Sequence, residues 1–518
     1  MRCWPTFSYR TQSDKCLYLG EGMSNLKVYN SYSRQKEEFV PLTPHHVGMY
    51  VCGPTVSGES HLGHARGFIT FDVIYRYLLY LGYKVRYVRN ITDAGHFEEE
   101  GRAAEDKISK KAVIEKMEPM ELVQKYSNLF HWAMHQFNNL DPSIEPTATG
   151  HIVEQIEMIK QIIAAGYAYV VNGSVYFDVK KYAGKYPYGK LSGRKLDELL
   201  ETTRDLESQE EKRNRQDFAL WKVAPPDHIM RWTSPWGEGF PGWHIECSAM
   251  STKYLGPEFD IHGGGMDLMF PHHESEIAQS TICNHHVPAR YWLHNNMITI
   301  NGKKMGKSYN NVIRLTDMFS GNSPLLTQAY HPMTIRFFIL QTHYRSTLDF
   351  GNEALQAAEK GLRRLWDSYQ ELRKMTSDPR KEINAQLETQ FNSLCREFDD
   401  FMNDDFNTAK VLANMFNLVN HINSFRSGDL EKTTLSPETL SYVKNQFKNF
   451  LEDVMGLKDE NGQESERLQG IMDLVIDIRK DARSKKDYQT SDRIRKQLLE
   501  IGILLKDEKD GRVSFTLE

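Results

Sequence analysis

Residues 47–93 read VGMYVCGPTVSGESHLGHARGFITFDVIYRYLLYLGYKVRYVRNITD, and this stretch decides the fold. Apolar residues alternate over 47–51, as expected for a strand, and then recur at helical spacing over 65–81. Gly82 ends the helix, and a second strand is expected at 85–88. A strand, a helix and a strand over this length predict a crossover unit with two parallel strands.

The residues that follow both predicted strands indicate where a ligand would bind. Cys52 follows the first strand directly, and Thr92 lies just beyond the second. In open parallel sheets, ligands bind off the carboxyl ends of the strands. We therefore expect the segment 52–64 and Thr92 to border a ligand site.

The rest of the chain extends the α/β pattern and then changes to helices. Strands are predicted at 174–177, 259–261 and 297–300, helices at 121–140, 152–165 and 271–282, and a tight turn at Asn301-Gly302. The charged residues 196–215 contain few apolar side chains, which indicates a solvated insertion. Further helices are predicted at 353–374, 381–398, 408–424, 437–454, 466–484 and 490–500, before two short strands around Asp510-Gly511.

Composition excludes several classes of protein. The chain has 518 residues, 40% hydrophobic and 26% charged, which indicates a globular protein of several domains. No apolar run approaches the roughly 20 residues that span a bilayer, and residues 1–22 lack the apolar core of a secretory signal. Six cysteines without disulfide-scaffold spacing favour a reducing cytoplasm. The net charge of −5 argues only mildly against a nucleic-acid partner, because phosphate contacts need a local basic surface rather than a basic protein.

Two histidines stand just before the predicted helix 65–81. His61 and His64 are three positions apart, with Gly63 between them. A helix N-terminus presents free N–H groups and a positive dipole end, which suits phosphate, and imidazoles add donors for developing negative charge. The alternative is a pair of unrelated loop histidines.

A basic loop follows the predicted turn at Asn301-Gly302. It reads Lys303-Lys304-Met305-Gly306-Lys307-Ser308. Lysines on either side of a glycine make a cationic loop that could reach a triphosphate and neutralise departing pyrophosphate. Short basic surface loops are common, so the alternative reading is a solvated loop.

A set of soft metal ligands is scattered over the chain. Cys52 lies at a strand end and Cys247 in a later helix, while His272 and Glu276 stand four positions apart on one helix face. Two thiolates, an imidazole and a carboxylate make a tetrahedral zinc shell. Spacing alone leaves four competitors open, namely His244, His262, His273 and Glu274. Buried free cysteines and surface histidines are the alternative to a metal site.

The chain resembles a known family at these motifs. His61-Leu62-Gly63-His64 is similar to the HIGH signature of class I aminoacyl-tRNA synthetases, and residues 304–308 are similar to their KMSKS signature. Residues 49–54, 90–93, 243–250 and 262–276 closely resemble those of cysteinyl-tRNA synthetases, and the similarity runs from about Met23 to the C-terminus. Two departures stand out: Ser57-Gly58-Glu59-Ser60 replaces a segment that usually carries Tyr-Asp, and Gly306 replaces a serine.

The resemblance implies a role for each motif. The zinc ligands would be Cys52, Cys247, His272 and Glu276, and the cysteine pocket would include Cys52, Thr92, Trp243 and His272. His61 and His64 with His262, Gly263, Gly264, Gly265 and Lys307 would contact ATP. The catalytic groups would be His61, His64, Lys304 and Lys307, with Mg²⁺ on the phosphates. The implied reaction forms cysteinyl-adenylate from L-cysteine and ATP and passes cysteine to the terminal adenosine of tRNA(Cys).

The resemblance also implies the domain organisation, an α/β fold with a Rossmann-like core. The expected divisions are an extension at 1–22, a catalytic core at 23–145 and 233–300 around a connective insertion at 146–232, a KMSKS-loop region at 301–350, a helical tRNA-binding domain at 351–460 and a small anticodon-recognition domain at 461–518. In the last, Arg479, Lys480, Arg483, Lys485, Lys486, Arg493, Arg495 and Lys496 form a basic stretch, and Tyr488 could stack on a base; a solvated helix face is the alternative.

Two other enzyme classes would fit parts of this sequence. A cysteine-dependent ligase acting on a small molecule could use the same adenylating core, but such relatives lack the long helical tail that follows residue 350. A zinc-dependent hydrolase would need a general base beside a metal-bound water, and the chain has no HExxH motif. The resemblance further favours a monomer.

Overall fold

The computed structural model describes residues 25–94, 107–194, 211–226, 228–306, 309–426, 433–507 and 513–517. They divide into two compact units, Met1–Leu457 and Lys458–Glu518. The predicted extension 1–22, most of the charged stretch 196–215, Lys307 and the turn at Asp510-Gly511 lie outside the described residues. The division into seven segments remains a prediction.

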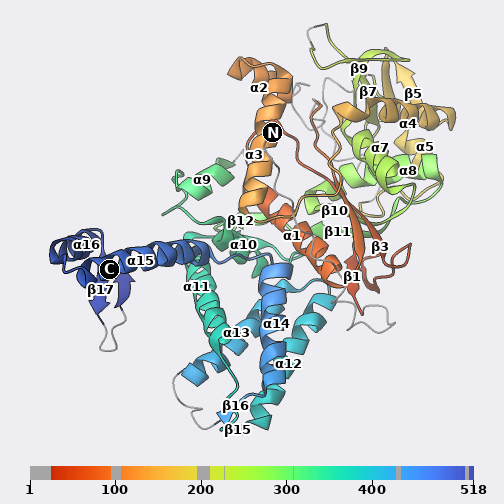
Figure 1. Cartoon of the computed structure of the whole chain (residues 1–518). Coiled ribbons are helices and arrows are strands. Elements are labelled where there is room, and N and C mark those ends of the chain that lie inside the picture. The colour runs from red at the N-terminus through yellow and green to blue at the C-terminus, as the bar shows by residue number, and fades with distance from the viewer. Residues whose placement is uncertain are drawn as a thin grey trace, which may run out of the picture. The chain divides into compact units, whose positions relative to one another are not determined.

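A four-stranded parallel sheet forms the centre of the first unit (Figure 1). Its order is β11 (Ala289–Asn295), β10 (Phe259–Gly265), β3 (His46–Val51) and β4 (Lys84–Arg89). The crossover predicted from residues 47–93 is confirmed, because α1 (Leu62–Tyr80) joins β3 to its parallel neighbour β4. The chain leaves β3 towards β4 on one side, while β10 and β11 continue the sheet on the other, so the strand order reverses beside β3.

Helix α1 begins three residues earlier than its apolar pattern indicated. His61 is the N-cap residue, with extended backbone, and Leu62 is fully buried. The helix buries apolar residues around most of its circumference, including Phe68, Phe71 and Ile74. A helix that is apolar on nearly all sides must be covered by several elements.

Strand β10 is longer than predicted. Residues 263–265 continue the strand, where the sequence suggested that it ended at Ile261. The glycines permit close packing, because a Cβ at Gly263 would lie 2.3 Å from the ring of Phe71 and one at Gly264 would lie 2.8 Å from the ring of His273. Glycine is poor in strand interiors unless another group approaches closely, and that exception applies here.

A five-stranded antiparallel sheet is inserted between β4 and β10. Its order is β5 (Ala168–Val171), β6 (Ser174–Phe177), β7 (Phe218–Val223), β9 (Gly237–Pro241) and β8 (Trp232–Ser234). It is preceded by α2 (Lys107–Glu115), α3 (Pro119–Gln136), η2 (Thr149–His151) and α4 (Ile152–Ala164), and α5 (Val179–Ala183) follows β6. The predicted end of the insertion at 232 falls inside this sheet. The chain then re-enters the core through α7 (Trp243–Leu255), η4 (Met266–Met269) and α8 (His272–Asn284).

A small three-stranded sheet carries the basic loop. It consists of β12 (Ile298–Ile300), β13 (Lys303–Lys304) and β14 (Leu348–Phe350). The predicted turn is confirmed: Ile300 pairs with Lys303, and Asn301 and Gly302 both have positive φ, as two-residue hairpins of this kind require. Helices α9 (Leu315–Ser320) and α10 (Pro332–Leu340) connect this sheet to the next region.

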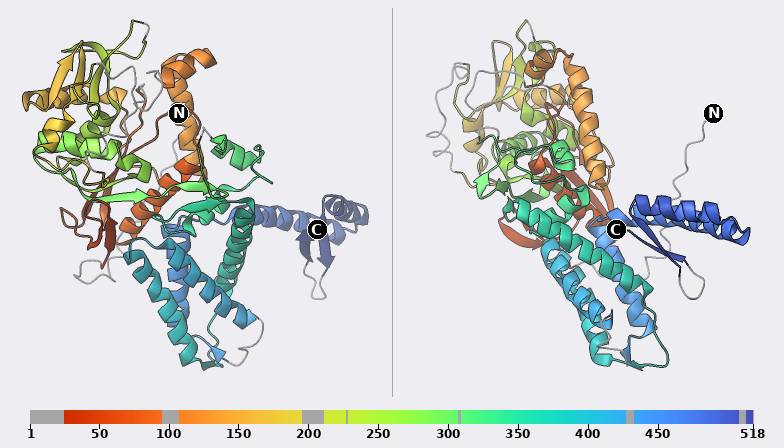
Figure 2. Two further views of the ribbon diagram at one scale, coloured as in Figure 1. Left: turned by 180° about the vertical axis from the view of Figure 1, so that it is seen from behind. Right: turned by 90° about the vertical axis from the view of Figure 1, so that its left-hand side faces the viewer.

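Helices α11 to α14 pack together in the remainder of the first unit, as both turned views show (Figure 2). They are α11 (Asn352–Lys374), α12 (Ala385–Asn403), α13 (Thr408–Arg426) and α14 (Pro437–Lys448), which continues as η6 (Asn449–Val454). Helix α12 begins later than predicted because Asn384 caps it and the two residues before form β15 (Glu382–Ile383), paired with β16 (Thr433–Thr434). A hairpin of β1 (Lys27–Asn30) and β2 (Gln35–Glu38) begins the described chain.

The second unit is a helical pair with a small hairpin. It contains α15 (Glu460–Ser484), α16 (Tyr488–Glu500), β17 (Ile503–Asp507) and β18 (Val513–Leu517). Its core gathers Met472, Ile476, Ile503 and Leu505, against which Phe515 packs. Across the described residues of both units, none of the helices is long and apolar enough to cross a bilayer.

Asp399 should make the stability of the fold depend on pH. Burial raises the pKa of this α12 carboxyl, a hydrogen bond with the Tyr80 hydroxyl lowers it and the neighbouring Asp400 raises it, so that the pKa is about 6. Since the unfolded pKa is lower, the folded state binds the proton more tightly, so stability falls as the pH rises from about 4 to about 6 and is then constant. The Asp399→Asn side chain cannot ionise. The free energy of unfolding of this variant should therefore be about 1–2 kcal/mol higher than that of the parent at pH 8, and the difference should vanish towards pH 4.

Urea unfolding at pH 8 and pH 4.5 measures this difference. The exposed Asp367 of α11 provides the control, because Asp367→Asn removes the same charge from solvent. Equal stabilities of the Asp399→Asn protein and the parent at pH 8 would show that the carboxyl is adequately solvated as a charge.

Candidate active site and metal centre

The site lies where the order of the parallel sheet reverses. Cys52 directly follows β3, and its backbone N–H donates to the carbonyl oxygen of Gly263 in β10 at 3.1 Å. Thr92 lies beyond the end of β4, and its N–H donates to the carbonyl oxygen of Pro54 at 3.1 Å. The carboxyl ends of three neighbouring strands therefore meet at one edge, which is where open α/β sheets bind ligands.

Four predicted metal ligands come together at this edge. One ligand atom from each of Cys52, Cys247, His272 and Glu276 lies within 4.8 Å of every other. The two Sγ atoms are 3.8 Å apart, and Glu276 Oε1 lies 3.7 Å from Cys52 Sγ and 3.1 Å from His272 Nε2. All four residues are buried. The cluster joins the end of β3 to α7 and α8, since Cys247 and Glu276 lie 195 and 224 residues beyond Cys52 in the chain.

A second set of four ligands overlaps the first. It keeps Cys52 and Glu276 but takes its imidazoles from His262 and His273. His273 Nε2 lies 3.3 Å from Cys52 Sγ, and His262 Nε2 lies 2.9 Å from Glu276 Oε2. The two-thiolate set is the softer one and suits zinc better.

The other two competitors have different partners. His244 Nδ1 lies 2.9 Å from His272 Nδ1, so it is placed to orient a predicted ligand. The Glu274 carboxylate accepts hydrogen bonds from the backbone N–H groups of Gly189 and Ser192 at 2.8 and 3.0 Å. The structure thus reduces the alternatives from the sequence to two overlapping sets.

The electrostatics of the cluster fit a divalent cation. Burial raises the pKa of the Cys52 thiol well above its usual value, and the neighbouring Cys247 raises it further. Burial also raises the pKa of Cys247 and lowers the pKa of His273 well below its usual value, to which His262 and His294 contribute. Thiolates are therefore disfavoured here unless a cation lies among them, and a bound metal deprotonates its thiol ligands.

The predicted pocket residues adjoin this cluster. The Trp243 ring lies over the imidazole of His272, with centroids 4.3 Å apart. The Thr92 hydroxyl donates to Glu246 Oε2 at 2.9 Å. Trp243 therefore borders a predicted ligand, and Thr92 contacts the residue that precedes Cys247, while contact of either residue with cysteine remains a prediction.

Asn90 links the pocket to the cluster, and sequence reasoning did not single it out. Its Oδ1 accepts from the Gly53 N–H at 2.9 Å and lies 3.7 Å from Cys247 Sγ. Its Nδ2 donates to the Thr92 hydroxyl at 3.1 Å. The available signal was a polar residue directly after a buried strand, in the segment 90–93 that carries the family resemblance.

His262 occupies an interior position. Its side chain is fully buried, and its ring stacks on Trp292 with centroids 4.4 Å apart. Of the three glycines that follow it, Gly263 and Gly264 are also buried. Contact of these four residues with adenosine remains a prediction.

The two histidines of the first signature lie face to face. Their rings stack with centroids 3.8 Å apart and planes 11° from parallel. The backbone N–H of His61 donates to His64 Nδ1 at 3.2 Å. Because Nδ1 accepts this bond, neutral His64 carries its proton on Nε2, which is then its donor towards a ligand.

Backbone hydrogen bonds join the first signature to the segment that follows the basic loop. The N–H of Leu62 donates to the carbonyl of Ile313 at 3.1 Å, and the N–H of Leu315 donates to that of Ser60 at 2.9 Å. Met305 reaches the first signature, since its Cε would lie 3.0 Å from a Cβ at Gly63. The sequence predicted both motifs, and the structure places them in contact.

Asn311 braces the basic loop across its ends. Its Oδ1 accepts from the N–H of Gly306 at 2.9 Å, and its Nδ2 donates to the carbonyl of Lys304 at 3.1 Å. The Lys304 side chain is exposed. No feature of the sequence singled out Asn311, because asparagine is common in loops.

Comparison with known proteins bears on the whole chain. Residues 38–360 match the family model of tRNA synthetases class I (C) catalytic domain, and residues 397–458 match the DALR domain. The cysteine–tRNA ligase of Bacteroides fragilis is 56% identical over 489 residues, covering 94% of this chain and 98% of its own length. The chain belongs to the class I cysteine–tRNA ligase family. Family members from Porphyromonas gingivalis and Chlorobaculum tepidum are 54% and 45% identical, again over 94% of this chain and 98% of theirs.

Solved structures of more distant synthetases share the fold of this ligase family. The ternary complex of Agrobacterium radiobacter K84 agnB2 LeuRS with tRNA and LeuAMS gives a TM-score of 0.57 at 12% identity, covering 81% of this chain and 85% of that one. Methionyl-tRNA synthetase of Mycobacterium tuberculosis with methionyl-adenylate gives 0.53 at 13% identity, covering 79% and 89%. At these identities the likeness shows the fold, and it agrees with the predicted parallel-sheet core and helical region.

The departure from the family at residues 57–60 has a structural counterpart. Glu59 accepts a hydrogen bond from the Thr316 hydroxyl at 2.7 Å and lies 3.6 Å from Arg314 Nη1. Both partners follow the basic loop. The unusual segment therefore adds a side-chain contact between the two signature regions.

The basic stretch predicted to bind tRNA lies on α15 and α16. Arg479 does not belong to its surface, because it is 3% exposed. The sequence could not show this, since the arginine sits on the inner face of α15. The exposed members are Lys480, Arg483, Lys485, Lys486, Arg493, Arg495 and Lys496, beside Tyr488, which is 60% exposed.

Proposed function

We propose that this cysteine–tRNA ligase activates L-cysteine with ATP to cysteinyl-adenylate and then transfers cysteine to the 3′-terminal adenosine of tRNA(Cys). The observation that carries the proposal is the pair of backbone hydrogen bonds that joins Ser60 and Leu62, at the first signature, to the segment 313–315 that follows the basic loop, together with a buried cluster of thiol, imidazole and carboxylate at the reversal point of the sheet. An adenylating site and a soft-metal site then share one ligand edge.

The metal would be zinc, held by Cys52, Cys247, His272 and Glu276. When bound, zinc supplies preferential affinity for a thiolate over an alcohol. Trp243, whose ring packs at a tilt on that of His272, would bound the pocket on one side and keep it small. The bond from Thr92 to Glu246 would fix the threonine hydroxyl and hold the opposite wall.

Activation would depend on positioning and charge. The cysteine carboxylate attacks the α-phosphate of ATP and displaces pyrophosphate, so no side-chain nucleophile is needed. His61 and His64 at the N-terminus of α1 would donate to phosphate oxygens, with the Nε2 proton of His64 available because its Nδ1 is engaged. Lys304 and Lys307 of the basic loop would neutralise the departing pyrophosphate, with Mg²⁺ on the phosphates.

Transfer would follow on the same site. A ribose hydroxyl of the terminal adenosine attacks the mixed anhydride and releases AMP. The helical domain and the second unit would hold the body of the tRNA, since the exposed lysines and arginines of α15 and α16 suit its phosphates and Tyr488 could stack on a base. The DALR match at 397–458 favours this reading over a cysteine-dependent ligase for a small molecule.

We further propose a reducing compartment, the cytoplasm, and a monomer. Cys52, Cys247, Cys283 and Cys395 are free thiols in the structure. The first two are proposed metal ligands only 3.8 Å apart, so oxidation to a disulfide would destroy the zinc site.

Pyrophosphate exchange tests the proposed function. The purified chain should exchange labelled pyrophosphate into ATP when cysteine is present, and should charge tRNA(Cys). A chain that exchanged with serine as well as with cysteine would not have the proposed pocket. A chain that exchanged but charged no tRNA would favour the small-molecule ligase.

Deletion of the second unit should separate the two half-reactions. The structure divides after Leu457, so removing residues 458–518 deletes a whole compact unit. The KM for tRNA should rise about tenfold or more as several phosphate contacts are lost, while cysteine-dependent pyrophosphate exchange stays within about twofold. Steady-state kinetics of both activities measures this, and an equal loss of both would contradict the assignment of tRNA binding to this unit.

A further inference from the structure

A buried cluster of charges lies along the C-terminal half of α1, beyond the signature histidines at its N-terminus. Asp72 and Arg76 are in α1, and Arg336 is in α10. Asp72 Oδ2 accepts a hydrogen bond from Arg76 Nε at 2.8 Å and a short one from Arg336 Nη2. The side chains of Asp72 and Arg336 are 2% and 0% exposed. The proposed chemistry uses none of the three.

The three charged side chains also form hydrogen bonds with the backbone of two other chain segments. Arg336 donates to the carbonyls of Met455 and Phe137 at 2.7 and 2.9 Å. Arg76 donates to the carbonyls of Asp453 and Asn138 at 3.1 and 2.5 Å. The second oxygen of Asp72 accepts from the N–H of Leu140 at 2.7 Å. The cluster therefore fastens the segments 137–140 and 453–456 to α1 and α10.

Two features show that the segments are shaped to reach the cluster. Gly456 has a φ of +61°, and a Cβ there would lie 2.5 Å from Arg336 Nη2, so only glycine fits. Asn138, with a φ of +57°, donates from Nδ2 to the carbonyl of Gly456 at 2.9 Å. This bond joins the two segments directly.

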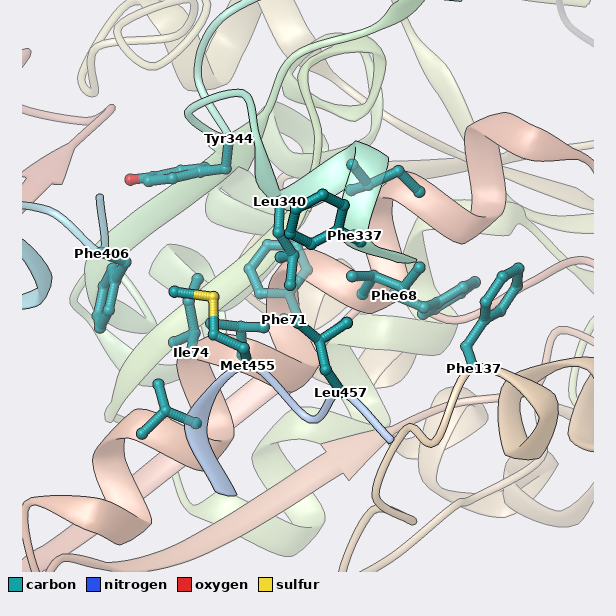
Figure 3. Close-up of a cluster of buried hydrophobic side chains, with 14 of the residues drawn as sticks. Phe68, Phe71, Ile74, Phe137, Phe337, Leu340, Tyr344, Phe406, Met455 and Leu457 are labelled. Carbon is teal, nitrogen blue, oxygen red and sulfur yellow. The ribbon is translucent and has the colours of Figure 1, made fainter. Parts of the chain in front are cut away.

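Apolar side chains from the same elements belong to one buried hydrophobic cluster (Figure 3). This hydrophobic cluster includes Phe68, Phe71 and Ile74 of α1 and Phe337 and Leu340 of α10. Its other labelled members are Phe137, Tyr344, Phe406, Met455 and Leu457. Burial strengthens the attraction between the charges and makes a half-satisfied cluster costly.

Helix α1 thus connects the signature histidines to the helical domain. Its last turns also contact α12 and η6. The Tyr77 hydroxyl donates to Asn403 Oδ1 of α12 at 2.9 Å, and Tyr80 packs on Phe450 of η6 with ring centroids 5.2 Å apart. The chain enters the second unit at Lys458, directly after the segment that the arginines hold.

We propose that Asp72, Arg76 and Arg336 are positioning residues for transfer to tRNA, which rests on the proposed function. They fix the position of the helical domain relative to α1. That position determines where a tRNA bound to the helical domain presents its terminal adenosine to the site. Activation of cysteine does not depend on the position of the helical domain, because separate backbone hydrogen bonds through Leu62 and Ser60 join the start of α1 to the basic loop region.

The test compares half-reactions in the full-length protein. Asn138→Gly removes the bond between the two segments and suits the positive φ, and Asp72→Asn removes the central charge. Asn172→Gly is the matched control, because this exposed turn residue also has a positive φ, of 50°. Each variant is assayed for pyrophosphate exchange, for kcat of tRNA charging and for Tm.

The expected result is a fall in charging kcat of about 3- to 30-fold for Asn138→Gly, with exchange within about twofold of the parent and the control unchanged. Asp72→Asn should show the same imbalance with a lower Tm. If the rates of pyrophosphate exchange and tRNA charging fell equally, in proportion to the loss of folded protein, the cluster would have only a structural role and the proposal would be wrong. An unchanged kcat of charging would also overturn it. A parent without cysteine-dependent exchange would instead refute the proposed function.

Discussion

Replacing Cys247 by serine should release the metal and weaken the distinction between cysteine and serine. Cys247 Sγ is one of only two thiols in the described cluster, 3.8 Å from that of Cys52. An alcohol in its place neither ionises nor matches the softness of zinc, and loss of a direct ligand exceeds the roughly 10- to 100-fold effect of losing an outer partner. Zinc content should fall to about a tenth of an equivalent or less, and kcat/KM for cysteine about 1,000-fold or more.

Selectivity carries the more specific expectation. Serine differs from cysteine by one atom, and a pocket that relies on shape separates such near-isosteres by only about 100-fold. The preference of the Cys247→Ser protein should therefore fall to that level. Metal analysis and pyrophosphate exchange with each amino acid provide the measurements. Cys283→Ser, which changes a partly buried thiol of α8 outside the cluster, should leave both quantities unchanged.

The same variant decides between the two overlapping ligand sets. Cys247 belongs to the first set, while the second consists of Cys52, His262, His273 and Glu276. A Cys247→Ser protein that kept a full equivalent of zinc would place the metal in the second set. If selectivity also remained intact, Cys247 would have no part in recognising the substrate.

The sequence predicted the core of the fold because local and global preferences agree there. The alternation over 47–51, the apolar pattern over 65–81 and the stop at Gly82 each belong to one element of a crossover whose topology is nearly obligatory. The pattern failed where packing overrides propensity. Residues 263–265 continue β10 because Phe71 and His273 approach the glycines, and only the tertiary structure shows those neighbours.

The site was predictable in its residue types and not in its grouping. Soft ligands could be recognised one by one, but the sequence could not choose among His244, His262, His272 and His273. The choice depends on which strand ends and helix faces meet. Asn90 and Asn311 were missed because their roles come from hydrogen bonds to Thr92, Gly53, Lys304 and Gly306, and asparagine is common beside turns.

Substituting His64 by asparagine should slow adenylate formation without disturbing the metal. Asparagine offers an oxygen that can accept the bond from the N–H of His61, as Nδ1 of the imidazole does at 3.2 Å, but it lacks the donor at the position of Nε2. Removing one preorganised donor to developing negative charge typically costs about 100- to 1,000-fold in kcat. Cysteine-dependent pyrophosphate exchange should fall by that factor, while zinc content and the KM for cysteine stay near those of the parent.

If His64 acts on a phosphate of ATP, the His64→Asn protein should lose rate in adenylate formation and much less in transfer to tRNA. Transfer from preformed cysteinyl-adenylate to tRNA, followed in a single turnover, should therefore fall much less than exchange, because pyrophosphate has already departed. His135→Asn is the matched control, since that side chain is 55% exposed and pairs with Asp141 away from the signatures. Equal losses in both half-reactions would assign His64 to the shape of the α1 N-terminus, and an unchanged exchange rate would leave the stacked His61 ring as the imidazole that meets the phosphate.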